Sequence, residues 1–347
     1  MPKMDKKRDV TIDLMRTIGI IAVVASHSNF MVGFMSLFHN PLFMFAAGVF
    51  HPHDASRTWK EYSEYLKKRF FRIYLPFVLL TAFLTLIQPL LVRLQLLSGV
   101  FPYTLKDMPI KLLTILGMRV EGFSGPCWFL ISLLEISIAF ETIRVFTQRF
   151  SGKVEFVVLL SISVILFPLG IFTNLPRVLD ESATMFIWYM LGFYARPLFN
   201  AFQSKLANAS AKEKMALMAG LCAVCIVLFP CMVLLARTGC EWRGGAIPPL
   251  VAFGTAMGIV WSFSLAGLLK QLPFAPILAL PGKSSFTIMA WHIGAFNLLT
   301  ILLNGSPCHE GVWSVIYCLW GVVLPTVGKL CWDRILECFP ALRRSST

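Results

Sequence analysis

Charged residues are scarce in this chain. Only 14% of its 347 residues are Asp, Glu, Lys or Arg, whereas 57% are hydrophobic and the mean hydropathy is +0.72. These values lie outside the range of ordinary soluble domains. No long stretch has the low apolar content of a disordered tail or linker. The composition therefore argues against a soluble or disordered protein and favours one that lies in a membrane.

Acidic residues are scarcer than basic ones. The chain has 18 Asp and Glu against 31 Lys and Arg, which gives a formal net charge of +13. A basic surplus of this size is also found in nucleic-acid-binding proteins, but here no basic cluster occurs apart from an adjacent apolar run. We therefore expect no nucleic-acid partner.

Cysteine and histidine lack the spacing of a metal site. The nine cysteines form no disulfide or metal framework, and no Cys/His/carboxylate pattern resembles a zinc site. Cys222 and Cys225 lie within a predicted helix, so we interpret them as small buried apolar residues. Cys240 and Cys308 fall in predicted outward-facing loops, and the sequence leaves open whether they form a disulfide. No metal cofactor is expected.

Long apolar runs take up most of the chain. Runs near 20 residues are long enough to cross a bilayer as helices. About ten are predicted, at roughly 11–33, 37–51, 73–96, 126–146, 154–173, 183–200, 215–236, 248–269, 284–304 and 312–331. The expected fold is an all-α polytopic membrane bundle. Its membrane domain spans 11–331, between a basic N-terminus at 1–10 and a tail at 332–347.

Lys and Arg are unevenly divided between alternate loops. If the N-terminus is cytoplasmic, that side of the membrane holds 23 of them and the opposite side holds seven. Cytoplasmic loops of membrane proteins carry such an excess. Both termini are therefore expected in the cytoplasm, and the net charge reflects topology.

Arg16 and His27 stand eleven residues apart within the first apolar run. At about 100° per residue they fall on nearly the same helical face, roughly 16 Å apart along the axis. Such residues are costly in a bilayer, usually face the bundle interior and mark functional sites. The pair predicts an anion-binding group near one membrane face and an acid–base group deeper in. His27 is the candidate general base because imidazole titrates near neutral pH; a purely structural histidine is the alternative.

Arg69 and Arg72 precede the third apolar run. They are three apart, so on a helix they would share a face on the cytoplasmic side. Arginine forks suit phosphate oxygens. The alternative is a basic cluster that contacts anionic lipid.

Three further residues are candidates for function. Glu135 lies near the middle of the helix predicted at 126–146, where it could orient His27 or His292 or serve as a structural partner of another helix. His292 lies about eight residues into the ninth predicted helix. Trp128 could stack on a sugar ring or belong to the interfacial aromatic belt.

Five motifs occur in a characteristic order. They are Asp13-Leu14-Met15-Arg16 followed by His27; Pro41-Leu42-Phe43-Met44-Phe45 with Gly48-Val49-Phe50; Arg69-Phe70-Phe71-Arg72-Ile73-Tyr74-Leu75-Pro76; Gly125-Pro126-Cys127-Trp128-Phe129-Leu130; and Ser284-Ser285-Phe286 with Trp291-His292. In this order and at these spacings the chain resembles the acyltransferase 3 family of integral membrane O-acyltransferases. It is particularly similar to small stand-alone members that acetylate sugars of surface polysaccharides. One departure is Ala46-Ala47, where the family often has Ser before the glycine.

The resemblance implies an enzyme that moves an acetyl group from cytoplasmic acetyl-CoA to a hydroxyl of a cell-surface or lipid-linked sugar. The setting would be a bacterial plasma (inner) membrane, with membrane lipid, acyl-CoA and a glycan acceptor as partners. His27 would be the base, supported by Glu135 and His292. The arginines at 16, 69 and 72 would hold the CoA, and Trp128 the acceptor. The sequence leaves open the acceptor sugar, acetyl against a larger acyl such as succinyl, direct transfer against an acyl-enzyme, and monomer against homo-oligomer.

The main alternative is a proton-coupled transporter or flippase of a lipid-linked or small polar solute. Such proteins also use intramembrane Arg, His and Glu. The chain has no evident two-half repeat, and its Arg69-x-x-Arg72 cluster favours the enzyme. A non-catalytic sensing module ranks last.

Overall fold

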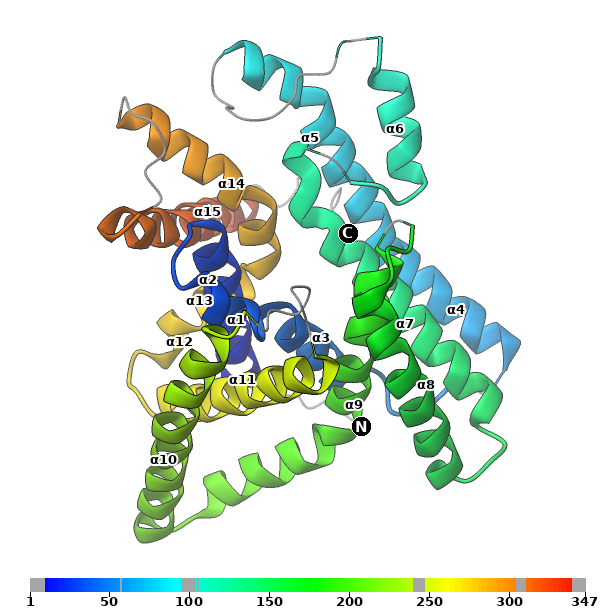
Figure 1. The fold of residues 1–347 in the computed structure, drawn as a ribbon, viewed down its shortest axis with the longest axis vertical. Coiled ribbons are helices and arrows are strands. Elements are labelled where there is room, and N and C mark those ends of the chain that lie inside the picture. Colours follow the sequence, from blue (N-terminus) through cyan, green and yellow to red (C-terminus); the bar gives the residue numbers. More distant parts are fainter. Residues whose placement is uncertain are drawn as a thin grey trace.

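The computed structural model describes residues 10–56, 58–94, 104, 106–120, 122–176, 178–239, 247–303 and 310–338 (Figure 1). Every regular element within these residues is helical, which confirms the expected all-α fold. The helices are α1 Val10–His27, α2 Val32–Ser36, α3 His39–Val49, α4 Trp59–Arg69, the π-helix η1 Phe70–Tyr74, α5 Leu75–Arg93, α6 Met108–Leu116, the 3₁₀ helix η2 Gly122–Cys127, α7 Trp128–Thr147, α8 Gly152–Phe172, α9 Leu179–Asn208, α10 Ala211–Ala236, α11 Pro248–Leu269, α12 Ala275–Leu278, α13 Leu280–Lys283, α14 Ser285–Leu302 and α15 Val312–Cys338.

Eight helical segments of the described chain are long and apolar enough to cross a membrane. They are Val10–His27, Val32–Val49, Trp59–Arg93, Gly152–Phe172, Ala211–Ala236, Pro248–Leu269, Ser285–Leu302 and Val312–Cys338. The two other predicted spans coincide with α7 and α9, which carry more charge. Part of that charge is buried in the protein, as at Glu141, Arg144 and Asp180, so it is not exposed to lipid. The chain is a multi-pass membrane protein.

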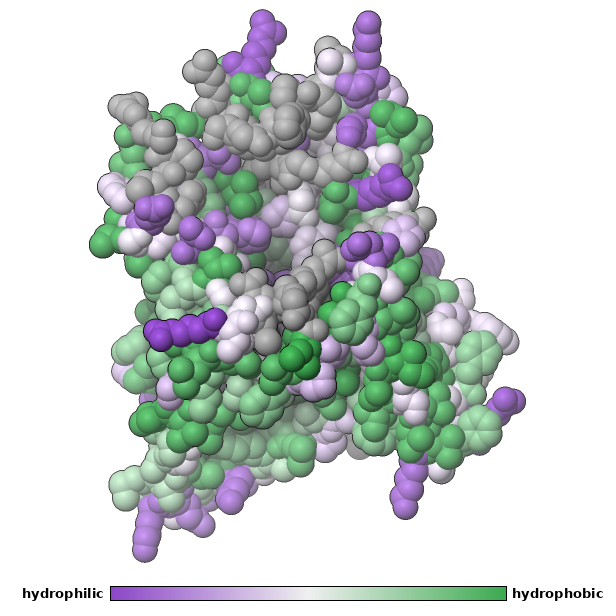
Figure 2. All heavy atoms as spheres, viewed as in Figure 1, coloured by the Kyte–Doolittle hydropathy of each residue, from purple (hydrophilic) through white to green (hydrophobic). Residues whose placement is uncertain are grey.

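The surface has the polarity of a bilayer protein. Figure 2 shows hydrophobic residues over the middle of the molecule and hydrophilic residues toward its upper and lower ends. The apolar window of α10 is only 6% buried within the protein. Cys222 on this helix is exposed and Cys225 is partly exposed, so the interpretation of both as buried is wrong. Cys240 and Cys308 lie outside the described residues.

Two boundaries differ from the prediction. The first helix ends at His27 rather than near residue 33, because Asn29 and Met31 adopt left-handed conformations with φ of 65° and 49°. Residues 59–69, expected before the third span, form α4. Its start is stabilised by a capping box in which Thr58 and Glu61 satisfy each other's backbone N–H groups.

Helix α1 lies among α3, α11, α13, α14 and α15 (Figure 1). Helix α3 in turn packs closely on α9 through two glycines. A Cβ atom on Gly48 would overlap the carbonyl oxygen of Tyr189, and one on Gly192 would overlap that of Phe45. Small residues permit such backbone contact between helices. The contact fixes one side of α3 against α9 and leaves another side to face the interior of the bundle.

Candidate functional site

A cavity of about 360 Å³ opens between α1, α3, η1 with the start of α5, η2 with the start of α7, and the start of α14. Its lining residues are Arg16, Ile20, Val23, His27, His39, Asn40, Phe43, Ala46, Ala47, Phe50, Arg72, Ile73, Pro76, Pro126, Trp128, Phe129, Leu130, Leu133, Ser285, Phe286 and Met289. The cavity therefore collects residues from all five of the sequence motifs.

One stripe of α1 forms a wall of this cavity. Arg16, Ile20, Val23 and His27 line it, at spacings of four, three and four residues. These are the intervals that place residues on one helical face. The prediction that Arg16 and His27 share a face is confirmed. Arg16 stands at one end of the stripe and His27 at the other, with only apolar side chains between them.

A stripe of α3 and the residue after it forms the facing wall. It runs from His39 and Asn40 through Phe43 to Phe50, again at helical intervals. The phenyl ring of Phe43 lies against Gly19, at the middle of α1. The short connection between α1 and α3 makes them antiparallel, so His39 lies at the His27 end and Phe50 at the Arg16 end.

The Arg16 end of the cavity is cationic. The Nη2 atom of Arg16 donates to Oγ of Ser285, the first residue of α14, at 2.8 Å. Arg72 lines the same cavity, and its guanidinium has no hydrogen-bond or ion-pair partner among the described residues. Two guanidinium groups facing one space can bind an anion such as phosphate.

Arg69 faces another part of the protein. Its Nε atom donates to the Tyr65 hydroxyl at 2.9 Å, and its guanidinium carbon lies 4.9 Å from the centre of that ring. It does not line the cavity. Arg69 ends α4, whereas Arg72 lies within the π-helix. A π-helix bonds residues i and i+5, so it has more residues per turn than an α-helix and the expected three-residue alignment does not hold.

The imidazoles of His27 and His39 line the other end of the cavity, whereas His292 is fully buried beside His27 and does not line it. The rings of His27 and His292 are 5.1 Å apart, centre to centre. Nδ1 of His292 lies 2.9 Å from the carbonyl oxygen of Ile288 and 3.0 Å from that of Met289. This nitrogen therefore carries the proton, by assignment from its partners. The buried Nε2 of His292 keeps a lone pair and has no hydrogen-bond partner in the described chain.

His39 and Asn40 were not predicted from the sequence. Both line the cavity, and their side chains are only 6% and 8% exposed. Nδ1 of His39 lies 2.7 Å from the carbonyl oxygen of Met35, so it too is the protonated nitrogen. No second polar residue follows His39 at a helical interval within the same apolar run, so the spacing argument used for Arg16 and His27 does not apply to it.

Glu135 does not line the cavity. Its carboxylate accepts a 2.6 Å hydrogen bond from the hydroxyl of Ser182 on α9, and that hydroxyl also lies 3.1 Å from the hydroxyl of Ser132. These contacts favour the alternative in which Glu135 joins two helices. Trp128, by contrast, lines the cavity as the first residue of α7.

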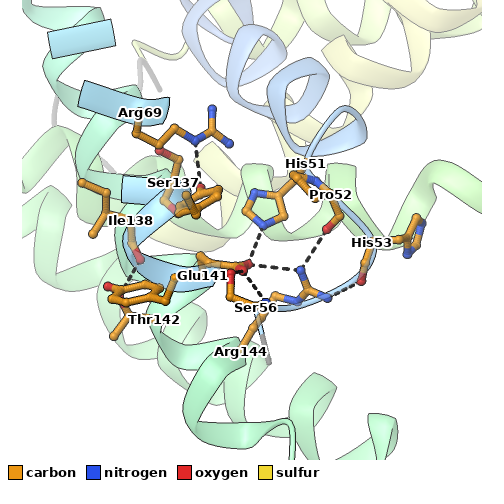
Figure 3. A network of polar contacts seen from close by, with 12 residues as sticks. His51, Pro52, His53, Ser56, Arg69, Ser137, Ile138, Glu141, Thr142 and Arg144 are labelled. Carbon is orange, nitrogen blue, oxygen red and sulfur yellow. Dashed lines mark hydrogen bonds and ion pairs between the residues drawn. The ribbon is translucent and has the colours of Figure 1, made fainter. Parts of the chain in front are cut away.

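A second polar cluster joins the loop that follows α3 to α7 (Figure 3). His51, which follows α3, is fully buried, with Nε2 2.9 Å from a Glu141 carboxylate oxygen and Nδ1 2.8 Å from the Tyr189 hydroxyl. Burial lowers the pKa of His51 from its usual value of 6.5, although Glu141 opposes this shift. His51 is therefore neutral, donates through Nε2 to the carboxylate and accepts from Tyr189.

Glu141 ties the loop after α3 to α7. Its other carboxylate oxygen accepts from the backbone N–H and hydroxyl of Ser56, at 2.8 and 2.7 Å. Arg144 donates to Glu141 at 3.3 Å and to the carbonyl oxygen of Pro52 at 2.9 Å (Figure 3). The carboxylate thus has four protein donors, as a buried charge requires. Its role is to hold the loop.

No metal centre is apparent in the part of the chain that the structure describes, since it contains no group of three or more His, Cys, Asp or Glu side chains able to hold an ion. Along its length the cavity instead has a cationic surface, then an apolar one, then one formed by imidazoles. These suit a long anionic ligand with an uncharged arm.

Comparison with known proteins identifies the family. A model of the acyltransferase 3 family, described as an acyltransferase domain, matches residues 9–328. Neither the curated proteins nor the solved structures contain a match to the chain. Because the family model covers nearly the whole sequence, this multi-pass membrane protein belongs to the acyltransferase 3 family and is a membrane acyltransferase.

Proposed function

We propose that the protein transfers an acetyl group from cytoplasmic acetyl-CoA to a hydroxyl of a cell-surface or lipid-linked sugar, in a bacterial plasma membrane. The observation that carries this proposal is the polarity of the α1 stripe. A guanidinium and an imidazole line one cavity, with apolar side chains between them over about 16 Å of helix. Acetyl-CoA has chemical groups in the same order along its length: phosphates, an uncharged pantetheine arm and the reacting thioester.

The cationic end would hold the donor. Arg72 offers an unpaired guanidinium to the phosphates, and Arg16 is held in place by Ser285. Arg69 adds positive charge from behind the π-helix while its Nε is bonded to Tyr65. Arginine forks and phosphate form charge-assisted bonds, which are about twice as strong as neutral ones. The apolar middle of the cavity would enclose the pantetheine arm.

The imidazole end would carry out the transfer. The ring nitrogens of His27 make no hydrogen bond within the described residues, so they are available to a substrate. His27 takes the proton of the acceptor hydroxyl, whose oxygen attacks the thioester carbonyl carbon. As the new C–O bond forms and the C–S bond breaks, His27 returns the proton to the departing sulfur, which leaves as the CoA thiol. General base catalysis of this kind contributes about 10²–10⁴-fold to the rate.

His292 acts on His27 rather than on the substrate. Its unprotonated Nε2 lies in the ring that neighbours His27. A lone pair at that position favours the imidazolium that forms during transfer, as the third group of a catalytic relay does. We therefore assign His292 as a positioning residue, and Trp128 as an aromatic surface for the acceptor.

Acetyl-CoA turnover in proteoliposomes tests the proposal. Wild type, His27→Ala and the control His53→Ala would receive acetyl-labelled acetyl-CoA and a glycan extract of bacterial membranes. His53 is an exposed loop histidine, so it controls for loss of an imidazole. We expect release of CoA, label on the glycan, and loss of both by at least about 10²-fold in His27→Ala only.

Other outcomes separate the parts of the proposal. Turnover that survives His27→Ala would support the acyl transfer activity but reject His27 as its general base. If wild type uses succinyl-CoA but not acetyl-CoA, the acyl donor is succinyl-CoA and not acetyl-CoA. A wild type that neither binds nor consumes an acyl-CoA would contradict the proposed reaction and favour transport of a lipid-linked solute.

A further inference from the structure

His39 and Asn40 are buried polar residues in the cavity wall for which the transfer reaction described above has no use. Both belong to the first turn of α3, beside Pro41, which is well tolerated at a helix start. They are adjacent in sequence, and both line the same cavity. An apolar pair would pack this end of the bundle without leaving any polar atom to satisfy.

Each side chain has unused hydrogen-bonding capacity. His39 uses Nδ1 for the Met35 carbonyl, so its Nε2 is an acceptor. The amide of Asn40 has no hydrogen-bond partner among the residues that the structure describes, although its side chain is 92% buried. The free polar atoms of both side chains are open to the cavity and not enclosed by protein. A ligand in that cavity can therefore form the hydrogen bonds that the protein does not supply.

Their position identifies the half of the site they serve. His39 lies at the His27 end of the two antiparallel stripes, and the imidazoles of His27 and His39 are close enough to interact electrostatically. The cationic end, with Arg16 and Arg72, is at the other end of the cavity. Neither a neutral imidazole nor an amide offers charge to a phosphate. An imidazole lone pair and an amide do match a hydroxyl, which both donates and accepts.

We propose that His39 and Asn40 bind a second hydroxyl of the acceptor, next to the hydroxyl that His27 deprotonates. The acceptor is then a polyhydroxylated molecule with adjacent hydroxyl groups, and one of the pair is acetylated while the other is held. This inference rests on the proposed acetyl transfer and adds a substrate requirement to it. Holding a neighbouring hydroxyl restricts the reacting oxygen to one orientation, which is a large part of the advantage of an enzyme site.

Small alcohols provide the probe, because they do not require the natural glycan to be known. Proteoliposomes would receive labelled acetyl-CoA with ethane-1,2-diol, propane-1,3-diol or ethanol, and transfer to each alcohol would be measured beside CoA release into water. We expect wild type to prefer ethane-1,2-diol to ethanol by about tenfold or more, since a site built to bind a hydroxyl discriminates against its absence. Propane-1,3-diol should fall between them.

Two substitutions at His39 separate its two nitrogens. In His39→Asn the amide nitrogen takes the place of Nδ1 and keeps the bond to Met35, but no atom replaces Nε2. In His39→Gln the amide reaches the Nε2 position and offers a carbonyl oxygen there. We expect His39→Asn to reduce transfer to ethane-1,2-diol much more than transfer to ethanol, and so to lose the preference for the diol. His39→Gln should recover most of the preference, and His53→Asn should match wild type.

Asn40→Ala gives a second variant should His39→Asn fail to fold, and it should also lose the preference for the diol. The inference is overturned if wild type shows no preference between the diol and ethanol, or if the His39 and Asn40 variants keep that preference. A parallel fall of CoA release into water would overturn it as well, by assigning these residues to the donor or the base. Failure of wild type to consume acetyl-CoA at all would instead reject the proposed transfer, and this inference with it.

Discussion

Removal of the Glu141 carboxylate should destabilise the half of the bundle that contains the loop after α3. Glu141 is 1% exposed and is bonded by His51, Arg144 and both the backbone and the hydroxyl of Ser56. Breaking a buried ion pair by removing one partner costs about 3–5 kcal/mol. Arg144 would keep its bonds to two loop carbonyls, so we expect about 3 kcal/mol for Glu141→Ala.

Thermal denaturation of the purified protein in detergent measures this effect. A loss of about 3 kcal/mol corresponds to a fall in the apparent Tm on the order of 5 °C for a chain of this size. Glu64→Ala is the matched control, because Glu64 is exposed on the neighbouring helix α4. A fall of less than about 1 °C for Glu141→Ala, or equal falls for both variants, would refute the view that this carboxylate holds the loop.

Three further predictions concern the same half of the molecule. Arg72→Gln should raise the KM for acetyl-CoA by about tenfold. It should also narrow the difference in KM between acetyl-CoA and acetyl-pantetheine, because acetyl-pantetheine lacks the nucleotide phosphates. Arg69→Gln should leave most of that difference in KM intact. Gly48→Leu should abolish folding, because its Cβ would overlap the backbone of α9, while Gly125→Ala meets no atom within 4 Å and should be purified in wild-type yield. Since burial lowers the pKa of His51 below 6.5, the unfolded state binds the proton more strongly. The contribution of His51 to stability is therefore complete above about pH 6.5 and declines as the pH falls below it, so Tm between pH 8 and pH 5.5 should fall more in wild type than in His51→Gln.

The helical pattern of the cavity wall could be predicted from sequence because it depends on local geometry. Arg16 and His27 interrupt an otherwise apolar run, and the helical period alone places them on one face. The same period placed Arg69 and Arg72 together, and there it failed, because the backbone between them is a π-helix. A π-helix of this kind depends on tertiary packing, which no local sequence pattern reports.

The loop after α3 shows a different limit. His51 resembles an ordinary loop histidine in sequence, but its partner Glu141 lies 90 residues further along the chain and Tyr189 lies 138 residues away. Contacts at such separations arise only from the packing of α3, α7 and α9. His39 was missed for a simpler reason, since a lone histidine at the start of an apolar run is a weak signal until its opposite wall is known.

The glycine contact between α3 and α9 divides the cavity into two walls of unequal stiffness. Backbone lies directly on backbone there, with no side chain to change rotamer, so α3 has little room to yield when a ligand enters. Any widening must come from η1 and α14, which supply Arg72 and Ser285. If Arg72 and Ser285 face the donor, as proposed, the donor side of the cavity is the compliant side, and the side with His39 keeps one shape through each round of transfer. An enzyme of this construction can accept different acyl donors by adjustment of one wall while its selection of the acceptor stays unchanged.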